Sequence, residues 1–530
     1  MKKLLYTSIL LILMAMSACS KVDIDEGGSK DSGVMDDSLF VRLTLALKNN
    51  PVTRASLNPN GGEEGDGWEY GLDYENEIND FSLFVFNGYD INGSSDAPVF
   101  TKRYFSPADV ETATVIDPET VHEKDVYSLD FKIPVYTGQF AYNYVNNELL
   151  LRQLHFMVAA NVGDITGDIS TLGQYRNYIP TVSFTSGSTL GEYSKFVMSN
   201  ERDAFYKSGV GTKADPVRMH VTIERLVSRI DFERDNYSRV SADGKSLVYE
   251  LKNSEDDVLS ELYLDELQIV NGSIQPSYLI KRVAEDINGT TNLTYLGDET
   301  PTPSGVATNY VIDPYSTQKT NANRDNTTLL TTLFGSTPTP RFALDPTKDN
   351  QILGYVNENT FDRSCTFAEF TTGVQLKCRF VPKHDIIIDY HAETDELLRG
   401  EMLNDYTVGM TFYMVEPNIP EIDESQRLYF LNEDDAIAYA TNTVREHFCK
   451  VVKYEGGVCY YYVYMRHSNN VEVVHNTMEF GIVRNNIYRF SINAATGPGT
   501  PTPDPRHPEE LKARIYVKKW VSVEHPIIYV

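Results

Sequence analysis

The 530-residue sequence is poor in basic residues, cysteine, tryptophan and long apolar runs. Its 47 lysines and arginines are outnumbered by 75 aspartates and glutamates, which gives a formal net charge of −28 at pH 7. Binding to nucleic-acid phosphates or to an anionic membrane surface requires a basic face, which so acidic a chain does not readily supply. The composition therefore argues against a nucleic-acid-binding protein.

Motifs of the common enzyme classes are also missing. The sequence has no glycine-rich phosphate loop, no His-Glu-x-x-His pair and no G-x-S-x-G elbow. Its ten histidines are scattered, and solvation explains the many carboxylates of an acidic surface. We therefore expect neither a catalytic site nor a cofactor.

Cysteine is too sparse to form a disulfide framework. Beyond the first twenty residues the chain has only Cys365, Cys378, Cys449 and Cys459. The last two flank a glycine-containing turn and could pair, but the sequence leaves the pairing of all four open. His447 lies close to Cys449 but has no second ligand pair at metal-binding spacing, so we expect no metal site.

The first twenty residues have the pattern of an export signal. Lys2 and Lys3 precede an apolar run that ends at Met16 and is followed by Ser-Ala-Cys. This run is too short to favour a membrane span, so the pattern is typical of a signal peptide. Its end resembles a bacterial lipobox, in which residues 1–18 are removed and Cys19 carries a lipid that tethers the exported protein.

Aromatic content and alternating patterns predict a β-rich fold. The chain has 34 tyrosines and 24 phenylalanines, which suit half-buried pleated sheets. The clearest strand alternates apolar and other residues with a period of two, its apolar positions being Leu39, Val41, Leu43, Leu45 and Leu47. We expect further strands at 81–86, 155–162, 220–232, 373–381, 410–415, 458–465, 479–493 and 514–530, and helices at 146–154 and 432–448, the latter capped by Asn432.

Two features divide the chain. The apolar phase of residues 220–232 changes near Arg225, as if the chain leaves one sheet for another, so we place a domain boundary there. Residues 497–510 are rich in proline and are expected to form an extended spacer that cannot join a sheet. The final apolar strand must then find a groove, either in its own domain or in another copy by strand addition.

Several segments together resemble the fimbrillins of type V pili, and specifically the subunit family of the short, minor-type fimbriae of Bacteroidales. The most specific segment is Ile-Val-Arg-Asn-Asn-Ile-Tyr-Arg at residues 482–489. Residues 235–370 carry little of the resemblance. Supporting segments are the lipobox at Cys19, Val-Thr-Arg-Ala at 52–55, and residues 221–229, 379–383, 460–462 and 515–520.

The resemblance implies an all-β fold with a few short helices. It would consist of two transthyretin-like β-sandwich domains and a C-terminal donor strand. The corresponding division is a signal peptide at 1–18, a lipidated propeptide with the first strand at 19–54, an N-terminal domain at 55–225, a C-terminal domain at 226–496, a Pro-rich linker at 497–510 and the donor strand at 511–530.

The resemblance also implies a maturation route. A lipoprotein precursor reaches the outer membrane, and an arginine-specific protease cuts between Arg54 and Ala55. The cut removes the first strand with its five alternating apolar residues and leaves an apolar groove with unpaired backbone groups. The last strand of the next copy fills this groove and builds a head-to-tail filament. The donor residues are then Ile515, Val517, Trp520, Val521, Val523, Ile528 and Val530.

The implied function is that of a structural fimbrial subunit that serves adhesion and biofilm formation at the cell surface. Its partners would be copies of itself and accessory, anchor and tip subunits. Two alternatives stay open: a fimbrial anchor or accessory subunit that keeps its lipid at Cys19, and a tethered glycan-binding module. We expect the block Arg484-Asn485-Asn486 to set a turn or edge in the C-terminal sheet and to have no catalytic role.

Overall fold

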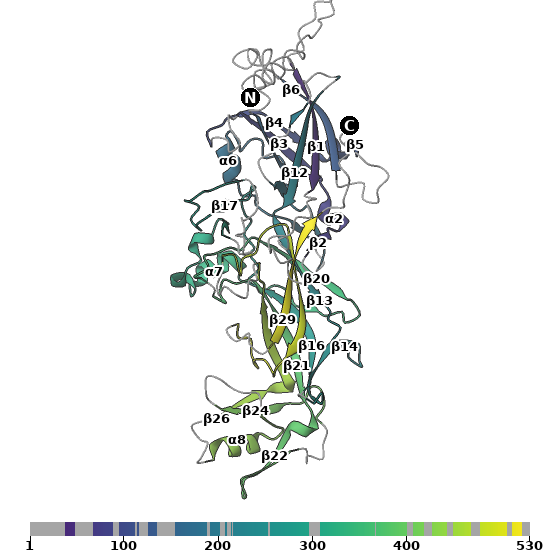
Figure 1. Ribbon diagram of the computed structural model, residues 1–530, viewed down its shortest axis with the longest axis vertical. Helices are drawn as coiled ribbons and strands as arrows, with labels where there is room; N and C mark the ends of the chain where they lie inside the picture. Colours follow the sequence, from purple (N-terminus) through teal and green to yellow (C-terminus); the bar gives the residue numbers. More distant parts are fainter. Residues whose placement is uncertain are drawn as a thin grey trace, which may run out of the picture.

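Strands dominate the computed structural model, which is elongated (Figure 1). The all-β fold with a few short helices is thus confirmed. Within the described ranges, no helix is long and apolar enough to cross a membrane. The structure describes residues 38–47, 67–87, 95–111, 114–115, 126–134, 154–187, 191–201, 207–208, 214, 216–252, 255–295, 308–365, 367–399, 406–417, 427–442, 449–467, 477–505 and 511–521.

A nine-stranded sheet forms one end of the molecule, in the order β4-β3-β7-β10-β12-β1-β6-β5 with β11 beside β12. Side chains of its strands alternate between two apolar clusters: Leu83 of β3 belongs to the cluster that contains the β1 side chains, whereas Phe84 belongs to the cluster that contains Leu172 of α6. The elements are β1 (Ser38–Leu47), α2 (Asp73–Asn76), β3 (Phe81–Asn87), β4 (Val99–Phe105), α3 (Pro107–Glu111), β5 (Thr114–Val115), β6 (Val126–Pro134), β7 (Leu154–Ala160), α6 (Leu172–Asn177), β8 (Thr185–Ser186), β9 (Tyr193–Ser194), β10 (Met198–Asn200), β11 (Lys207–Ser208) and β12 (Val217–Arg225).

Two further sheets face each other across a shared core. The five-stranded sheet β2-β29-β28-β13-β20 contributes Ile230 and Phe490, and the six-stranded sheet β14-β15-β16-β21-β27 with β19 contributes Leu264 and Leu376. Their strands are β2 (Gly67–Tyr70), β13 (Val227–Glu233), β14 (Ser238–Val240), β15 (Leu247–Lys252), β16 (Val258–Val270), β19 (Phe342–Ala343), β20 (Asn350–Asn357), β21 (Gly373–Pro382), β27 (Val458–Tyr464), β28 (Asn486–Ala495) and β29 (Leu511–Val521).

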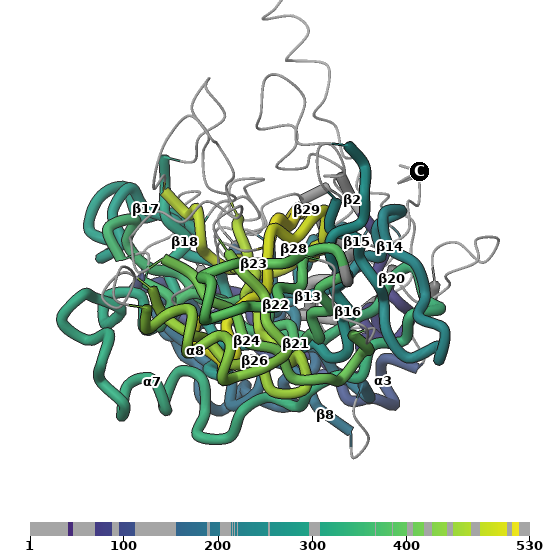
Figure 2. Tube along the Cα trace, turned by 90° about the horizontal axis from the view of Figure 1, so that it is seen from below, coloured from purple at the N-terminus to yellow at the C-terminus, as the bar shows by residue number. Residues whose placement is uncertain are grey.

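The chain changes sheets at a single residue. Strand β12 ends at Arg225 in the nine-stranded sheet, and β13 begins at Val227 in the five-stranded sheet. Short elements lie to one side of this passage in both views (Figures 1 and 2). They are β17 (Val283–Ala284), β18 (Tyr310–Val311), the 3-10 turns η2 (Ser316–Gln318) and η3 (Asn321–Asn323), and α7 (Thr327–Phe334).

A small sheet with one helix forms the opposite end, and the sequence analysis did not separate it from the C-terminal domain. Phe412 on one face joins the large core, whereas Phe430 packs with helix α8 on the other face. The sheet order is β23-β22-β25-β24-β26. The elements are η4 (His384–Ile386), β22 (Ile387–His391), β23 (Glu396–Arg399), β24 (Phe412–Pro417), β25 (Leu428–Phe430), α8 (Glu433–Thr441), β26 (Cys449–Tyr454) and η6 (Glu455–Gly457).

Helix α8 is capped as the sequence predicts, because the Asn432 side chain accepts a hydrogen bond from the Asp434 N–H. The helix buries its small side chains. Ala436 and Ala440 are buried, whereas Ile437 is exposed, because the helix packs through its smallest residues. The predicted helix at 146–154 lies outside the described residues, apart from Leu154, which begins β7.

The Pro-rich segment differs from the extended spacer that we expected. Ala495 at the end of β28 pairs with Leu511 at the start of β29, so the segment closes a hairpin. Residues 497–499 are buried, and Thr500 exchanges backbone hydrogen bonds with Tyr460 at the edge of β27. Proline-rich chain thus covers a sheet edge here, which is a common means of blocking unwanted strand pairing.

Candidate functional site

Strand β1 lies in the interior of the nine-stranded sheet, where the sequence predicts a strand. It runs parallel to β12 and antiparallel to β6, with paired residues on both sides from Val41 to Ala46. Val41, Leu43 and Leu45 are between 0% and 1% exposed, whereas Arg42 points outward and is exposed. The first strand is thus part of the apolar core.

Burial of β1 contributes substantially to the free energy of folding of this sheet. Each fully buried leucine or valine side chain contributes about 1.5–3 kcal/mol relative to exposure. Leu39 and Leu47 lie in the same strand, opposite Ile133 of β6 and Ile223 of β12 respectively. A chain without β1 would expose an apolar groove and two rows of unpaired backbone groups on β6 and β12.

Strand β29, where the sequence places the donor strand, lies in its own chain's five-stranded sheet. It pairs antiparallel with β28 over residues 511–519 and parallel with the four-residue strand β2 at its C-terminal end. Val517 is buried in the shared core, and Ile515 packs against that core. The isolated chain therefore keeps this strand folded back onto its own domain, the simpler of the two arrangements expected from the sequence.

Two of the other predicted site residues lie in the ladder between β2 and β29, and the rest lie outside the described residues. Trp520 and Val521 pair through their backbones with Glu69 and Tyr70 of β2. The remaining residues of the lipidation, cleavage and donor predictions lie outside the described residues: Cys19, Arg54, Ala55, Val523, Ile528 and Val530.

A buried arginine joins the two sheets where the chain passes between them. Arg225 donates from Nε to the backbone oxygen of Glu75 at 2.9 Å and from Nη1 to Oδ1 of Asn485 at 3.0 Å, and it also bonds the side chain of Asn76. Asn485 has a φ of 56°, a left-handed conformation that asparagine tolerates, and its N–H donates to the Val227 oxygen at 2.8 Å. The Arg-Asn-Asn block therefore sets a turn that fastens β28 to the passage.

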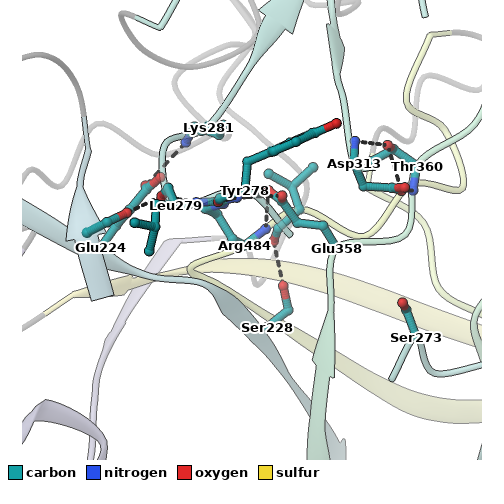
Figure 3. Close-up of polar contacts among 12 residues, drawn as sticks. Glu224, Ser228, Ser273, Tyr278, Leu279, Lys281, Asp313, Glu358, Thr360 and Arg484 are labelled. Atoms are coloured by element: carbon teal, nitrogen blue, oxygen red, sulfur yellow. Dashed lines mark hydrogen bonds and ion pairs between the residues drawn. The ribbon is translucent and has the colours of Figure 1, made fainter. Parts of the chain in front are cut away.

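The neighbouring Arg484 forms a fully buried ion pair with Glu358 (Figure 3). Its Nη2 lies 2.8 Å from Glu358 Oε2, and its Nη1 donates to the Leu279 backbone oxygen at 2.8 Å. Burial alone would raise the pKa of Glu358, but the Arg484 guanidinium holds it below its ordinary value. Lys281, two residues past Leu279, pairs with Glu224 of β12 at 3.2 Å, so this network also ties the two large sheets together.

A second charged cluster lies where β2 and β29 meet the same sheet. Arg229 contacts Asp231 at 2.9 Å and Glu75 at 3.2 Å, and Arg489 contacts Asp231 at 2.8 Å. Glu69 of β2 reaches both arginines. Burial alone would lower the pKa of Arg229, but Asp231 and Glu75 raise it above its ordinary value, so this guanidinium stays charged.

Among the described residues, no group of three His, Cys, Asp or Glu side chains is arranged to hold a metal ion. Cys378 lies opposite Cys459 in the ladder of β21 and β27, and all four described cysteines are free, so the pairing of Cys449 with Cys459 that the turn suggested is absent.

Sequence reasoning missed the residues that hold the C-terminal hairpin in place. Tyr461 donates to the Gly497 oxygen at 2.7 Å and Tyr454 to the Gly499 oxygen at 2.9 Å. Residues 460–462 were part of the family resemblance only, and no sequence pattern indicated that Glu69 contacts the C-terminal hairpin. Each of these contacts joins residues far apart in the sequence, which a local pattern cannot reveal.

The C-terminal part of the chain matches a known family. Residues 452–526 match the model of the C-terminal region of fimbrillin, described as major fimbrial subunit protein type IV. This segment contains β27, β28 and β29 and the block at 482–489. The resemblance to fimbrillins is confirmed by this match. No curated protein sequence matches the chain.

Several solved structures of bacterial proteins are similar to this chain. A fimbrilin from Porphyromonas gingivalis W83 shares 13% identity over 92% of this chain and 99% of that chain, with a TM-score of 0.37. The C-terminally truncated tip fimbrial protein Mfa3 of Porphyromonas gingivalis shares 10% identity over 91% of this chain and 100% of that chain, with a TM-score of 0.35. A fimbrial assembly protein of Parabacteroides distasonis ATCC 8503 shares 11% identity over 69% of this chain and 100% of that chain, with a TM-score of 0.25. Likeness at this level does not extend the family match beyond residues 452–526.

Proposed function

We propose that the protein is a structural subunit of a surface fimbrium of the type V kind, which polymerises by donor-strand exchange. The position of β1 carries this proposal. It is the first described strand of the chain, yet it lies between β12 and β6 with Val41, Leu43 and Leu45 in the core. One cut in the segment that follows it would separate β1 from every other described strand and would leave a groove shaped for a replacement.

The cut is proposed to fall between Arg54 and Ala55, after export of the precursor as an outer-membrane lipoprotein modified at Cys19. An arginine-specific protease has a competing site at Arg42, whose side chain is exposed. The backbone of Arg42, however, is paired with Asp130 of β6 and Arg218 of β12. Proteases bind extended chain that is free of such ladders, so we expect Arg42 to be protected.

The replacement strand is proposed to be the C-terminal strand of the next copy. Ile515 and Val517 alternate with Arg514, Tyr516 and Lys518, as Val41, Leu43 and Leu45 alternate in β1. Because the donor and the groove lie on different parts of the chain, their contact is heterologous and repeats without closing. Accessory, anchor and tip subunits would complete the fimbrium and its role in adhesion and biofilm formation.

A fimbrial anchor or accessory subunit is the second candidate. The observation that favours it is the completeness of the nine-stranded sheet in the uncut chain, which has β1 in place and no vacant groove between β6 and β12. Such a subunit would stay lipidated at Cys19 and would keep its first strand.

Intact mass spectrometry of the protein recovered from the cell surface separates these candidates. We expect a chain that begins at Ala55 and migrates in a ladder of polymers, and we expect an Arg54→Ala variant to stay uncut and monomeric. An Arg42→Ala variant is the matched control and should mature normally. A wild-type chain that begins at lipidated Cys19 would overturn the shaft role in favour of the anchor.

A further inference from the structure

The strand that covers the donor strand comes from the N-terminal part of the chain. Strand β2 lies on the far side of β29 from β28, and among the described strands β29 is its sheet neighbour (Figure 1). It pairs Gly67 to Tyr70 with Lys518 to Val521. An uncovered β29 would present a free edge at this end, which would be ready to pair with another chain.

In the uncut chain β2 is fastened at both of its ends. On one side, Gly71 and Leu72 lead directly into α2, whose Glu75 is 0% exposed. On the other side, residues 48–66 connect β2 to β1, which is held inside the nine-stranded sheet. The proposed cut site lies in this second connection, so the cut leaves β2 fastened through α2 alone.

The side chain of Glu69 fixes β2 against the sheet. Its carboxylate lies 2.7 Å from Arg489 and also bonds Arg229, while Lys518 of β29 lies 4.0 Å away. The side chains of Arg489 and Arg229 are 7% and 3% exposed, so these charge-assisted bonds are largely shielded from water. Glu69 thereby places β2 beside the C-terminal end of β29.

The arginines do not depend on Glu69. Arg229 keeps Glu75 and Asp231, and Arg489 keeps Asp231, if β2 moves away. The departure of β2 therefore leaves no buried charge unpaired, and buried unpaired charge is what would otherwise make such a movement prohibitive.

We propose that β2 is a releasable clamp on β29 and that Glu69 is its positioning residue. The inference rests on the proposed function, in which β29 is the donated strand. A segment held at both ends docks at a higher effective concentration than one held at a single end. The cut that frees β1 therefore also loosens the clamp, so one cleavage opens the groove in one sheet and prepares the donor strand in the other.

Hydrogen exchange on the full chain tests the clamp. Residues 60–65 are replaced by the recognition sequence of a site-specific protease. Hydrogen exchange is measured before and after cleavage. In the cleaved protein, β1 stays in its sheet but is no longer covalently joined to β2. We expect the amides of residues 518–521 to exchange about tenfold faster after the cut, because the local opening of β2 is favoured. The amides of β13 should be unaffected. A recognition sequence placed in residues 298–304 is the control, and its cleavage should leave β29 unchanged.

Substitutions test the role of Glu69 in the uncut chain. Glu69→Gln should accelerate exchange at the end of β29, Glu69→Asp should restore part of the protection, and exchange in β1 should not change. Glu233→Gln is the matched control, because Glu233 also approaches Arg489, at 3.7 Å, but belongs to β13. It should leave β29 protected.

Unchanged exchange in β29 after the engineered cut would overturn the clamp, even if filaments of chains that begin at Ala55 form normally. Equal effects of Glu69→Gln and Glu233→Gln would likewise remove the special role of Glu69. A surface protein that keeps Cys19 would refute the proposed function, while the exchange measurement would still decide whether β2 restrains β29.

Discussion

The two terminal strands of the described chain are held in different ways. Strand β1 lies inside a sheet with long neighbours on both sides, whereas β29 has one long neighbour and the four-residue cover β2. Three side chains of β1 are at most 1% exposed, whereas in β29 Val517 is 5% exposed and Ile515 is only partly buried. Strand β1 is thus deeply embedded, whereas β29 is covered lightly, which suits the proposed function, in which β1 is removed by a covalent cut and β29 is transferred to another copy.

The connections to these strands differ as well. β1 is joined to the rest of the chain by the segment that contains Arg54. β29 follows a segment whose backbone is fixed by Tyr454 and Tyr461 and by the two hydrogen bonds between Tyr460 and Thr500. We therefore expect β29 to move about a fixed point past this anchor while the edge of β27 stays covered.

The largest effect is expected when a buried side chain of β1 is shortened in the precursor. Leu43→Ala should lower the free energy of unfolding of the uncut chain by about 2–5 kcal/mol, because it leaves a cavity at a fully buried position. The mature protein recovered from cells that express this variant should be as stable as mature wild-type protein, because a chain cut after Arg54 has lost residue 43. Urea unfolding of both forms checks this, with Arg42→Ala as the exposed control. Equal destabilisation of both forms would contradict a removable β1.

The anchor before β29 can be broken by a single methyl group. A Cβ atom on Gly499 would lie 2.2 Å from the Tyr460 backbone oxygen, which is too close for any real contact. Gly499→Ala should destabilise the chain by about 1–3 kcal/mol and detach the segment from β27. Thermal unfolding and proteolysis near Thr500 measure this, and Gly409→Ala, where nothing lies within 4 Å but φ is 92°, reports the backbone strain alone.

A shortened side chain in β29 should have a smaller effect on the stability of the free subunit. Val517→Ala removes two methyl groups from a buried position and should cost about 1–2 kcal/mol of stability. If the same side chain fills the groove of the next copy, the variant should also dissociate more readily from filaments. Normal filament stability together with a destabilised monomer would show that residues beyond 517 make the intermolecular contact.

The smallest predicted effect is a pH dependence of the junction between the two regions. Because Arg484 keeps the pKa of Glu358 below its ordinary value, near 4.3 in unfolded chains, this pair adds stability above that pH and loses it as the pH falls through the folded pKa. Glu358→Gln should be less stable at pH 7 and should lose less on acidification. Urea titrations at pH 7 and pH 3.5 test the sign, and parallel losses in both proteins would contradict it.

Local patterns in the sequence predicted much of this structure. The alternation from Leu39 to Leu47 located β1, Asn432 located the start of α8, and the phase change near Arg225 marked the residue at which the chain changes sheets. Each signal is a property of neighbouring residues, because strand period and helix capping depend on local backbone geometry. The turn at Asn485 was also expected, although its arginine partner was not.

Contacts between distant segments could not be predicted in this way. The pairing of β2 with β29 joins residues about 450 positions apart, and nothing in Gly-Trp-Glu-Tyr at residues 67–70 specifies a partner. The Pro-rich segment had the composition of a spacer, yet its carbonyl groups found tyrosine hydroxyls on β26 and β27 and folded back. Composition describes what a segment prefers alone, and packing overrides that preference.

The sequence by itself determined the acidic charge of the chain, its β-rich character and the apolar strand at residues 39–47. The tertiary structure alone decided which strands are neighbours, because backbone hydrogen bonds between strands carry no sequence code and are selected by burial of whole faces. For the same reason the covers of β1 and β29, and with them the difference in how firmly each is held, emerged only from the fold.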